Sequence, residues 1–132
     1  KTMLFKTLDD MTILLQNSQK DIYEYFQTNH GLVKLKVNDI MYFEYSERKI
    51  NLYTNNDSIY QFYDIIYKLE ERFKQYHFIS PHKAFLVNID YIQNIHLNDL
   101  ILEKDIIIPI SKLKKKQIKD AYLNAISKEM DQ

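Results

Sequence analysis

One short segment of this 132-residue chain combines apolar residues with a serine, a histidine and a lysine, types that could serve catalysis or binding. The segment, residues 78–88, contains Ser80, Pro81, His82 and Lys83. Pro81 fixes its own φ and restricts the preceding residue to extended conformations, so Lys83 follows a stiff corner of the chain. A cation on a rigid loop at the end of an apolar strand indicates a binding surface.

Catalysis by this segment is not favoured. Ser80 and His82 could be a nucleophile and its base, but no acidic residue is placed in the sequence to orient the ring. A small hydrolase would need a pocket that joins these two side chains to a carboxylate. We therefore expect that this chain is not an enzyme. We interpret His82 as a partly buried ring that forms hydrogen bonds with nearby backbone.

The remaining composition argues against metal, nucleotide and membrane chemistry. Four histidines occur, but no pair has the short spacing of a helical or finger-type metal site, and the chain has no cysteine. A single glycine excludes a glycine-rich phosphate loop. No apolar run is long enough to span a bilayer, and the lack of cysteine indicates a reducing compartment. We expect no cofactor, no membrane partner and a cytoplasmic location.

Charge is balanced overall but uneven along the chain. Eighteen basic and eighteen acidic residues cancel, which argues against binding to nucleic acid by bulk charge alone. Between Ser111 and Lys119, however, five lysines occur without an acidic residue. One end of the folded chain is therefore expected to be locally positive.

The first 20 residues are expected to form a separate element. Apolar side chains recur at helical spacing between Thr2 and Asn17, which predicts an amphipathic helix. We expect residues 1–20 to be a linker or connector helix and residues 21–132 to be a single domain. The chain opens on Lys1 and not on methionine, so we expect it to be a piece of a longer protein.

From residue 21 onward, short apolar runs alternate with turn residues, which predicts a mainly β fold of antiparallel sheets. The strands are expected at residues 22–26, 32–37, 40–45, 50–54, 58–62, 85–87, 91–96, 100–103 and 106–110. Pro109 has no backbone donor, so its strand is expected to lie at a sheet edge or to end there.

Two short helices interrupt this β pattern. The first is expected over about residues 64–76, with Asp64 as its N-cap. The second is expected over about residues 111–127, capped by Ser111 and with Leu113 among the apolar residues of its packed face.

Three motifs together resemble the LytTR family of bacterial DNA-binding domains, in that family's order and at about its spacing. They are Asp39–Glu44, Phe78–Asn88 and Ile110–Lys112. The central motif, usually written Phe-x-Arg-x-His-Arg-Ser-x-x-Val-Asn, here has Ser80, Lys83 and Ala84 in place of its two arginines and its serine. The resemblance covers roughly residues 21–125.

The resemblance implies a function and a context. It implies a domain that binds double-stranded DNA by inserting loops into successive major grooves, with a bent duplex. It also implies the effector part of a two-component response regulator, with a receiver domain upstream and a possible homodimer on DNA. The fold implied is the multi-sheet antiparallel β fold of that family.

Candidate site residues follow from the three loops and their cations. The DNA-binding candidates are Arg48, Lys49, Lys83, Lys112, Lys114 and Lys115, and the loop-shaping candidates are Pro81, His82, Asn88 and Ser111. Lysines 114 to 116 could instead form the solvated face of a helix. A β-rich module that binds a partner peptide is the alternative function, and zero net charge mildly favours it.

Overall fold

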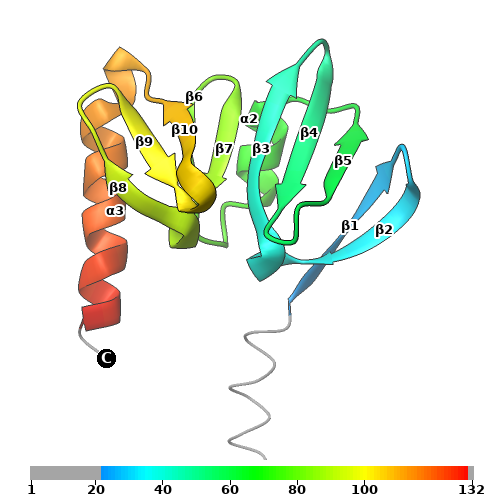
Figure 1. Ribbon diagram of the computed structural model, residues 1–132, viewed down its shortest axis with the longest axis horizontal. Helices are drawn as coiled ribbons and strands as arrows, with labels where there is room; N and C mark the ends of the chain where they lie inside the picture. Colours follow the sequence, from blue (N-terminus) through cyan, green and yellow to red (C-terminus); the bar gives the residue numbers. More distant parts are fainter. Residues whose placement is uncertain (1–21, 131–132) are drawn as a thin grey trace, which may run out of the picture.

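The structure is a computed structural model that describes residues 22–130, with side chains as far as residue 127. The expected helix over Thr2–Asn17 lies outside the described residues. The described part confirms a mainly β fold built from several antiparallel sheets (Figure 1).

Ten strands and two α-helices follow one another along the described residues. Their bounds are β1 (Tyr23–Thr28), β2 (Gly31–Lys36), β3 (Ile40–Ser46), β4 (Lys49–Thr54), β5 (Ile59–Phe62), α2 (Ile66–Arg72), β6 (Phe78–His82), β7 (Phe85–Asn88), β8 (Ile92–Ile95), β9 (Asp99–Leu102), β10 (Ile106–Pro109) and α3 (Lys115–Met130).

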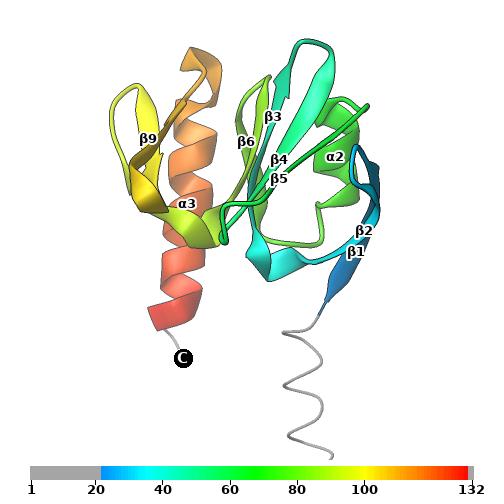
Figure 2. The same ribbon diagram turned by 45° about the vertical axis from the view of Figure 1, so that its right-hand side comes forward.

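A central sheet of five strands, in the order β5-β4-β3-β7-β6, divides the described part into two halves. The β1–β2 hairpin and α2 pack on one side of it, and the sheet β10-β9-β8 with α3 lies on the other (Figures 1 and 2). Side chains alternate across a strand, so Leu86 and the next residue, Val87, belong to different cores. Strand β7 is therefore shared by both halves.

The first core is an aromatic cluster. The Phe43 ring is fully buried and its centroid lies 5.2 Å from that of Phe73 and 6.1 Å from those of Phe26 and Phe78. Tilted and edge-on rings at these distances add to the stabilisation from burial alone. This cluster joins the hairpin, α2 and the central sheet.

The second core joins the other face of the sheet to the three-stranded meander and α3. A register shift between Ile40 and Tyr42 in the β3–β4 pair lets the adjacent residues Met41 and Tyr42 both enter this core. Ile118 of α3 is also buried there. Strand β10 lies at the edge of its sheet and ends at Pro109, which agrees with both alternatives predicted for it.

Contacts between loops fasten the two halves along one edge of the molecule, the lower edge in Figure 1. The hydroxyl of Tyr91 donates to the Asn38 carbonyl. Lys104 Nζ, in the β9–β10 turn, donates to the Asn55 carbonyl and lies 2.8 Å from the Asp57 carboxylate. These contacts fix the meander relative to the central sheet.

The helices differ from expectation at their ends. α2 has seven residues, Ile65 occupies its N-cap, and the Asp64 carboxylate accepts only from the adjacent Ile65 N–H. It ends early because Phe73 turns into the aromatic core and the chain must return to β6. α3 begins at Lys115, after a short 3₁₀ turn, η4 (Lys112–Lys114).

The stacked pair Tyr42 and Tyr53 predicts a loss of stability at high pH. Their ring centroids lie 4.4 Å apart, and burial, followed by the charges of Tyr53 and Glu44, raises the pKa of Tyr42 well above its usual value. In the unfolded chain Tyr42 would lose its proton near pH 10 while the folded protein keeps it, so unfolding becomes easier as the pH rises further. We expect the free energy of unfolding to fall above about pH 10, by at most about 1.4 kcal/mol per pH unit from this residue.

Denaturant titrations of the wild type and of Tyr42→Phe at several pH values would measure this effect. Phenylalanine cannot ionise, so the variant should lose less stability than the wild type over the same alkaline range. Equal losses in the two proteins would contradict the assignment to Tyr42.

Candidate nucleic-acid interface

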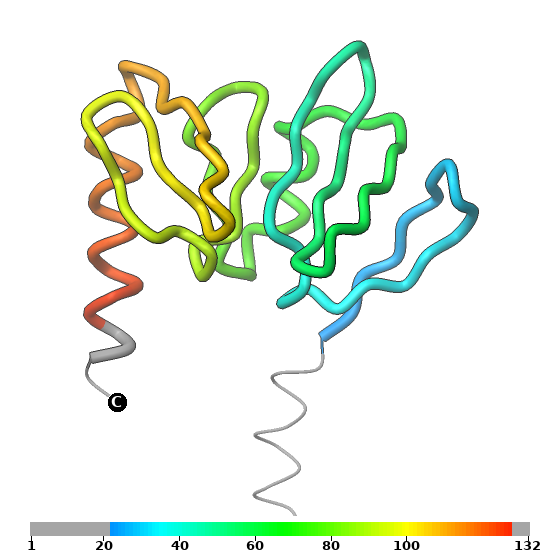
Figure 3. The backbone as a smooth tube through the Cα atoms, viewed as in Figure 1, coloured from blue at the N-terminus to red at the C-terminus, as the bar shows by residue number. Residues whose placement is uncertain are grey.

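Three turns leave the described domain at the same edge, the upper edge in Figure 3. They are the β3–β4 turn, the β6–β7 turn and the segment that leads from β10 into α3. The strand pairing requires the first two to lie together, because Glu44 near the end of β3 faces Phe85 at the start of β7.

Backbone hydrogen bonds join the middle turn to both of its neighbours. The Tyr45 N–H donates to the Ala84 carbonyl at 2.8 Å, and the Ser111 N–H donates to the Pro81 carbonyl at 2.7 Å. Each of these bonds connects a different pair of turns. The relative positions of the three turns are therefore set by the folded backbone.

The middle turn is tighter than the sequence indicated. Strand β6 continues to His82, so the expected loop over residues 80–84 is a strand end with a bulge, followed by the two-residue turn Lys83-Ala84. Pro81 is buried, and the Lys83 side chain is exposed. The cation thus stands at the tip of a short, well-supported turn.

The polar groups beneath this tip bond to backbone. Ser80 is only 4% exposed, and its hydroxyl lies 3.0 Å from the His82 carbonyl and 2.9 Å from the Phe85 carbonyl. The His82 Nδ1 accepts from the Ala84 N–H at 3.1 Å, which requires that nitrogen to be unprotonated. These side chains hold the turn in shape, and the geometry does not pair them as nucleophile and base.

The β3–β4 turn carries Arg48 in a conformation that is uncommon for its residue type. Glu47 and Arg48 have φ values of 52° and 68°, as in the two-residue hairpin turns that match strand twist. Arg48 is exposed, whereas Lys49 is half-buried and its Nζ lies 5.8 Å from the centroid of the Tyr63 ring. Of the two candidates in this turn, Arg48 is the better placed to meet a partner.

In the third segment, two of the three candidate lysines already bond within the domain. Lys114 Nζ donates to the Ser80 carbonyl at 3.0 Å, and Lys115 Nζ donates to Asn98 Oδ1 at 2.7 Å. Lys112 is exposed. Ser111 precedes η4, but its side chain makes no capping bond, and its carbonyl accepts from the Lys114 N–H instead.

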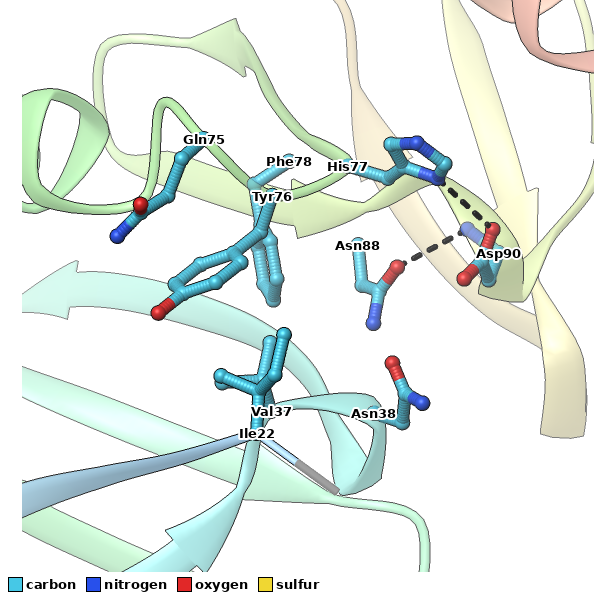
Figure 4. Close-up of a pocket in the computed structure, with 9 residues that line it drawn as sticks. All are labelled: Ile22, Val37, Asn38, Gln75, Tyr76, His77, Phe78, Asn88 and Asp90. Atoms are coloured by element: carbon cyan, nitrogen blue, oxygen red, sulfur yellow. Dashed lines mark hydrogen bonds and ion pairs between the residues drawn. The ribbon is translucent and has the colours of Figure 1, made fainter. Parts of the chain in front are cut away.

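Asn88 is not brought together with the other candidates. It lies at the far end of β7, and its amide donates to the Ile40 carbonyl at 2.9 Å while its Oδ1 accepts from the Asp90 N–H at 3.0 Å. Figure 4 shows it beside a pocket of about 180 Å³, near His77 and Asp90. Asn88 therefore shapes the opposite edge of the domain.

Sequence reasoning missed two features of this interface. Asn98 binds Lys115, and its carbonyl accepts from the Ile110 N–H, so the β8–β9 turn also supports the third segment. Leu113 was assigned to the packed face of the last helix, but its side chain is 95% exposed within η4. The assignment failed because the 3₁₀ turn has about three residues per turn and shifts Leu113 away from that face.

Neither a metal cluster nor a membrane-spanning helix is found in the described part of the chain. Residues 22–130 contain no group of three or more histidine or acidic side chains placed to hold a metal ion. No helix in the same range combines the length and the apolar character needed to cross a lipid bilayer.

Comparison with known proteins agrees with the motifs. The model of the LytTr DNA-binding domain family matches residues 30–122. Among solved structures, the chain is similar to the LytTr DNA-binding domain of a protein described as a methyl-accepting/DNA response regulator from Bacillus cereus, with 17% sequence identity and a TM-score of 0.66. That similarity covers 75% of this chain and 94% of the other, and it shows a shared fold. No curated protein matches the chain. The family model spans well over half of the sequence, which confirms the resemblance: the chain belongs to the LytTR family of DNA-binding domains.

Proposed function

We propose that this domain binds double-stranded DNA in a sequence-specific way and is the effector part of a bacterial transcription regulator. The observation that carries the proposal is the pair of backbone bonds from Tyr45 to Ala84 and from Ser111 to Pro81. They hold three cation-bearing turns at one edge of a stiff scaffold. Binding by such an edge costs little ordering entropy, because the turns are already in place.

The exposed cations would contact different parts of the DNA. Lys83 stands at the tip of the middle turn, where it would meet a base edge. Arg48 and Lys112, exposed on the two neighbouring turns, would contact phosphates of the same duplex. Lysine offers a point charge instead of the planar fork of arginine, so guanine readout by Lys83 is less selective geometrically. Lys114 and Lys115 support the third turn and add positive potential.

Membership of the family supports a regulatory context for this proposal. A receiver domain upstream would control the affinity of this domain, and two copies would bind paired half-sites as a homodimer in the cytoplasm. Residues 1–20 would connect the two domains. Cross-linking of the full-length protein on DNA with one and with two half-sites would test the dimer.

A selection from random duplexes, followed by titration of the selected site at increasing salt, tests the proposal directly. Phosphate contacts release counterions, so the logarithm of the affinity should fall linearly with the logarithm of the salt concentration. The slope of that line should be about −0.9 for each phosphate contact. Failure to enrich any sequence would refute specific binding. A salt-insensitive complex with a peptide would instead support the alternative, a protein-interaction module, which the family match does not favour.

Replacing Arg48 by glycine should weaken DNA binding with little effect on folding. Glycine accepts the positive φ of this position, so relief of strain offsets the greater freedom of the unfolded chain to within about 1 kcal/mol. Loss of the cation should reduce the salt slope by about one unit. Denaturant titration and fluorescence anisotropy would measure the two quantities.

Lys104→Gly provides a control for the loss of a cation at a positive φ, with its stability measured as well because it also removes the contacts to Asn55 and Asp57. Lys104 is also a cation with a positive φ, 69°, but it lies in the β9–β10 turn at the opposite edge. Its removal should leave the salt slope unchanged. If both variants change the slope equally, Arg48 has no special role in binding.

A further inference from the structure

Leu113 is the most exposed large apolar side chain among the described residues, at 95%. Single exposed leucines are common on protein surfaces and need no explanation by themselves. This one, however, lies between Lys112 and Lys114 in η4, which follows the segment bonded to the β6–β7 turn. Its position therefore calls for a physical account.

The backbone around Leu113 is held from several sides. The Ser111 N–H bonds the Pro81 carbonyl at 2.7 Å, the Lys114 N–H bonds the Ser111 carbonyl at 2.9 Å, and Lys114 Nζ bonds the Ser80 carbonyl at 3.0 Å. The preceding residue, Ile110, is buried. Leu113 thus projects from an anchored turn, whose backbone is held against the neighbouring turn that carries Lys83.

An apolar side chain with cations on both sides matches the chemistry of the major groove of DNA. Phosphates attract the neighbouring lysines, and the one apolar group on a base edge in that groove is the C5 methyl of thymine. Leucine has no donor or acceptor, so it can tell thymine from the other bases only through that methyl. Contact with it also removes part of the exposed leucine surface from water.

We propose that Leu113 contacts the C5 methyl of one thymine and makes this domain selective for thymine at that position. The proposal rests on the proposed function, and it adds a base preference that the cations cannot supply. Lys83 and Leu113 then read different positions of the same site, one by hydrogen bonding and the other by apolar contact.

Replacing single thymines by uracil in the selected duplex tests the contact, because uracil lacks only the C5 methyl. We expect one such replacement to weaken wild-type binding by about fourfold, the equivalent of one methyl group removed from water. The Leu113→Ala protein should bind the thymine and uracil duplexes equally at that position. This double-mutant cycle isolates the contact from other effects of either change.

Ile59→Ala is the control for loss of an exposed apolar side chain. Ile59 is 51% exposed and begins β5, next to the β4–β5 turn at the opposite edge, so this variant should keep the wild-type response to uracil. If the wild type and Leu113→Ala respond alike at every thymine, the proposal is overturned while specific binding stands. If the wild type selects no site at all, the proposed function fails and this proposal fails with it.

Discussion

Replacing Lys83 by alanine is expected to weaken binding to the selected DNA site by about 1 to 3 kcal/mol and to relax selectivity at one base position. Lys83 is exposed at the tip of the β6–β7 turn, directly between the two turns that the backbone bonds join to it. Its removal leaves the supports of the turn in place, since Ser80 and His82 bond to backbone. Competition titrations against all single-base variants of the site would measure both effects.

The way in which the loss of affinity varies among DNA sequences shows whether Lys83 contacts a base or a phosphate. A loss concentrated at one base pair indicates contact with a base edge, whereas a uniform loss across sequences indicates contact with phosphate. Lys83→Arg keeps the charge and restores the usual residue of the family motif, so it should retain or sharpen the preference. If Lys83→Ala binds DNA as the wild type does, Lys83 is not part of the proposed interface.

Replacing Phe43 by alanine is expected to lower the free energy of unfolding by about 3 to 5 kcal/mol. The ring is fully buried in contact with four other aromatic rings, so alanine would leave a cavity that a rigid sheet cannot fill. A loss of this size is a large fraction of the stability of a typical domain. Chemical denaturation followed by circular dichroism would measure it.

Tyr63→Ala is the matched control for the aromatic core. Tyr63 is 78% exposed, and its removal should change the free energy of unfolding by less than about 0.5 kcal/mol. If Phe43→Ala costs less than about 1 kcal/mol, the neighbouring rings can close the cavity and the core is softer than its packing indicates.

Strand positions could be predicted from sequence because the buried residues alternate with polar ones. In β4, for example, Ile50 and Leu52 are buried while Asn51 and Tyr53 are less so. The turn at Asn29–Gly31 was also predictable, because Gly31 adopts a φ of 87° that few other residues accept. The family motifs predicted which turns carry the proposed interface, and the structure places those three turns at one edge.

Other features depend on contacts between distant residues and could not be predicted locally. The length of α2 is set by the entry of Phe73 into a core formed with Phe26 and Phe43. The burial of Ser80 depends on the bulge in β6, and the bonds of Lys114 and Lys115 depend on Ser80 and on the β8–β9 turn. Helical periodicity placed Leu113 on a packed face, because nothing in the local pattern marks the 3₁₀ turn.

The two backbone bonds that flank the β6–β7 turn fix the spacing of the three turns, so the proposed interface would fit only one spacing of contacted base pairs along the double helix. Inserting one base pair between two contacted positions would shift the second by about 3.4 Å and rotate it by about 34°, which the joined turns cannot follow. A target with one mismatched base pair should therefore be bound better than a target in which every contacted base pair is correct but one extra base pair is inserted between them.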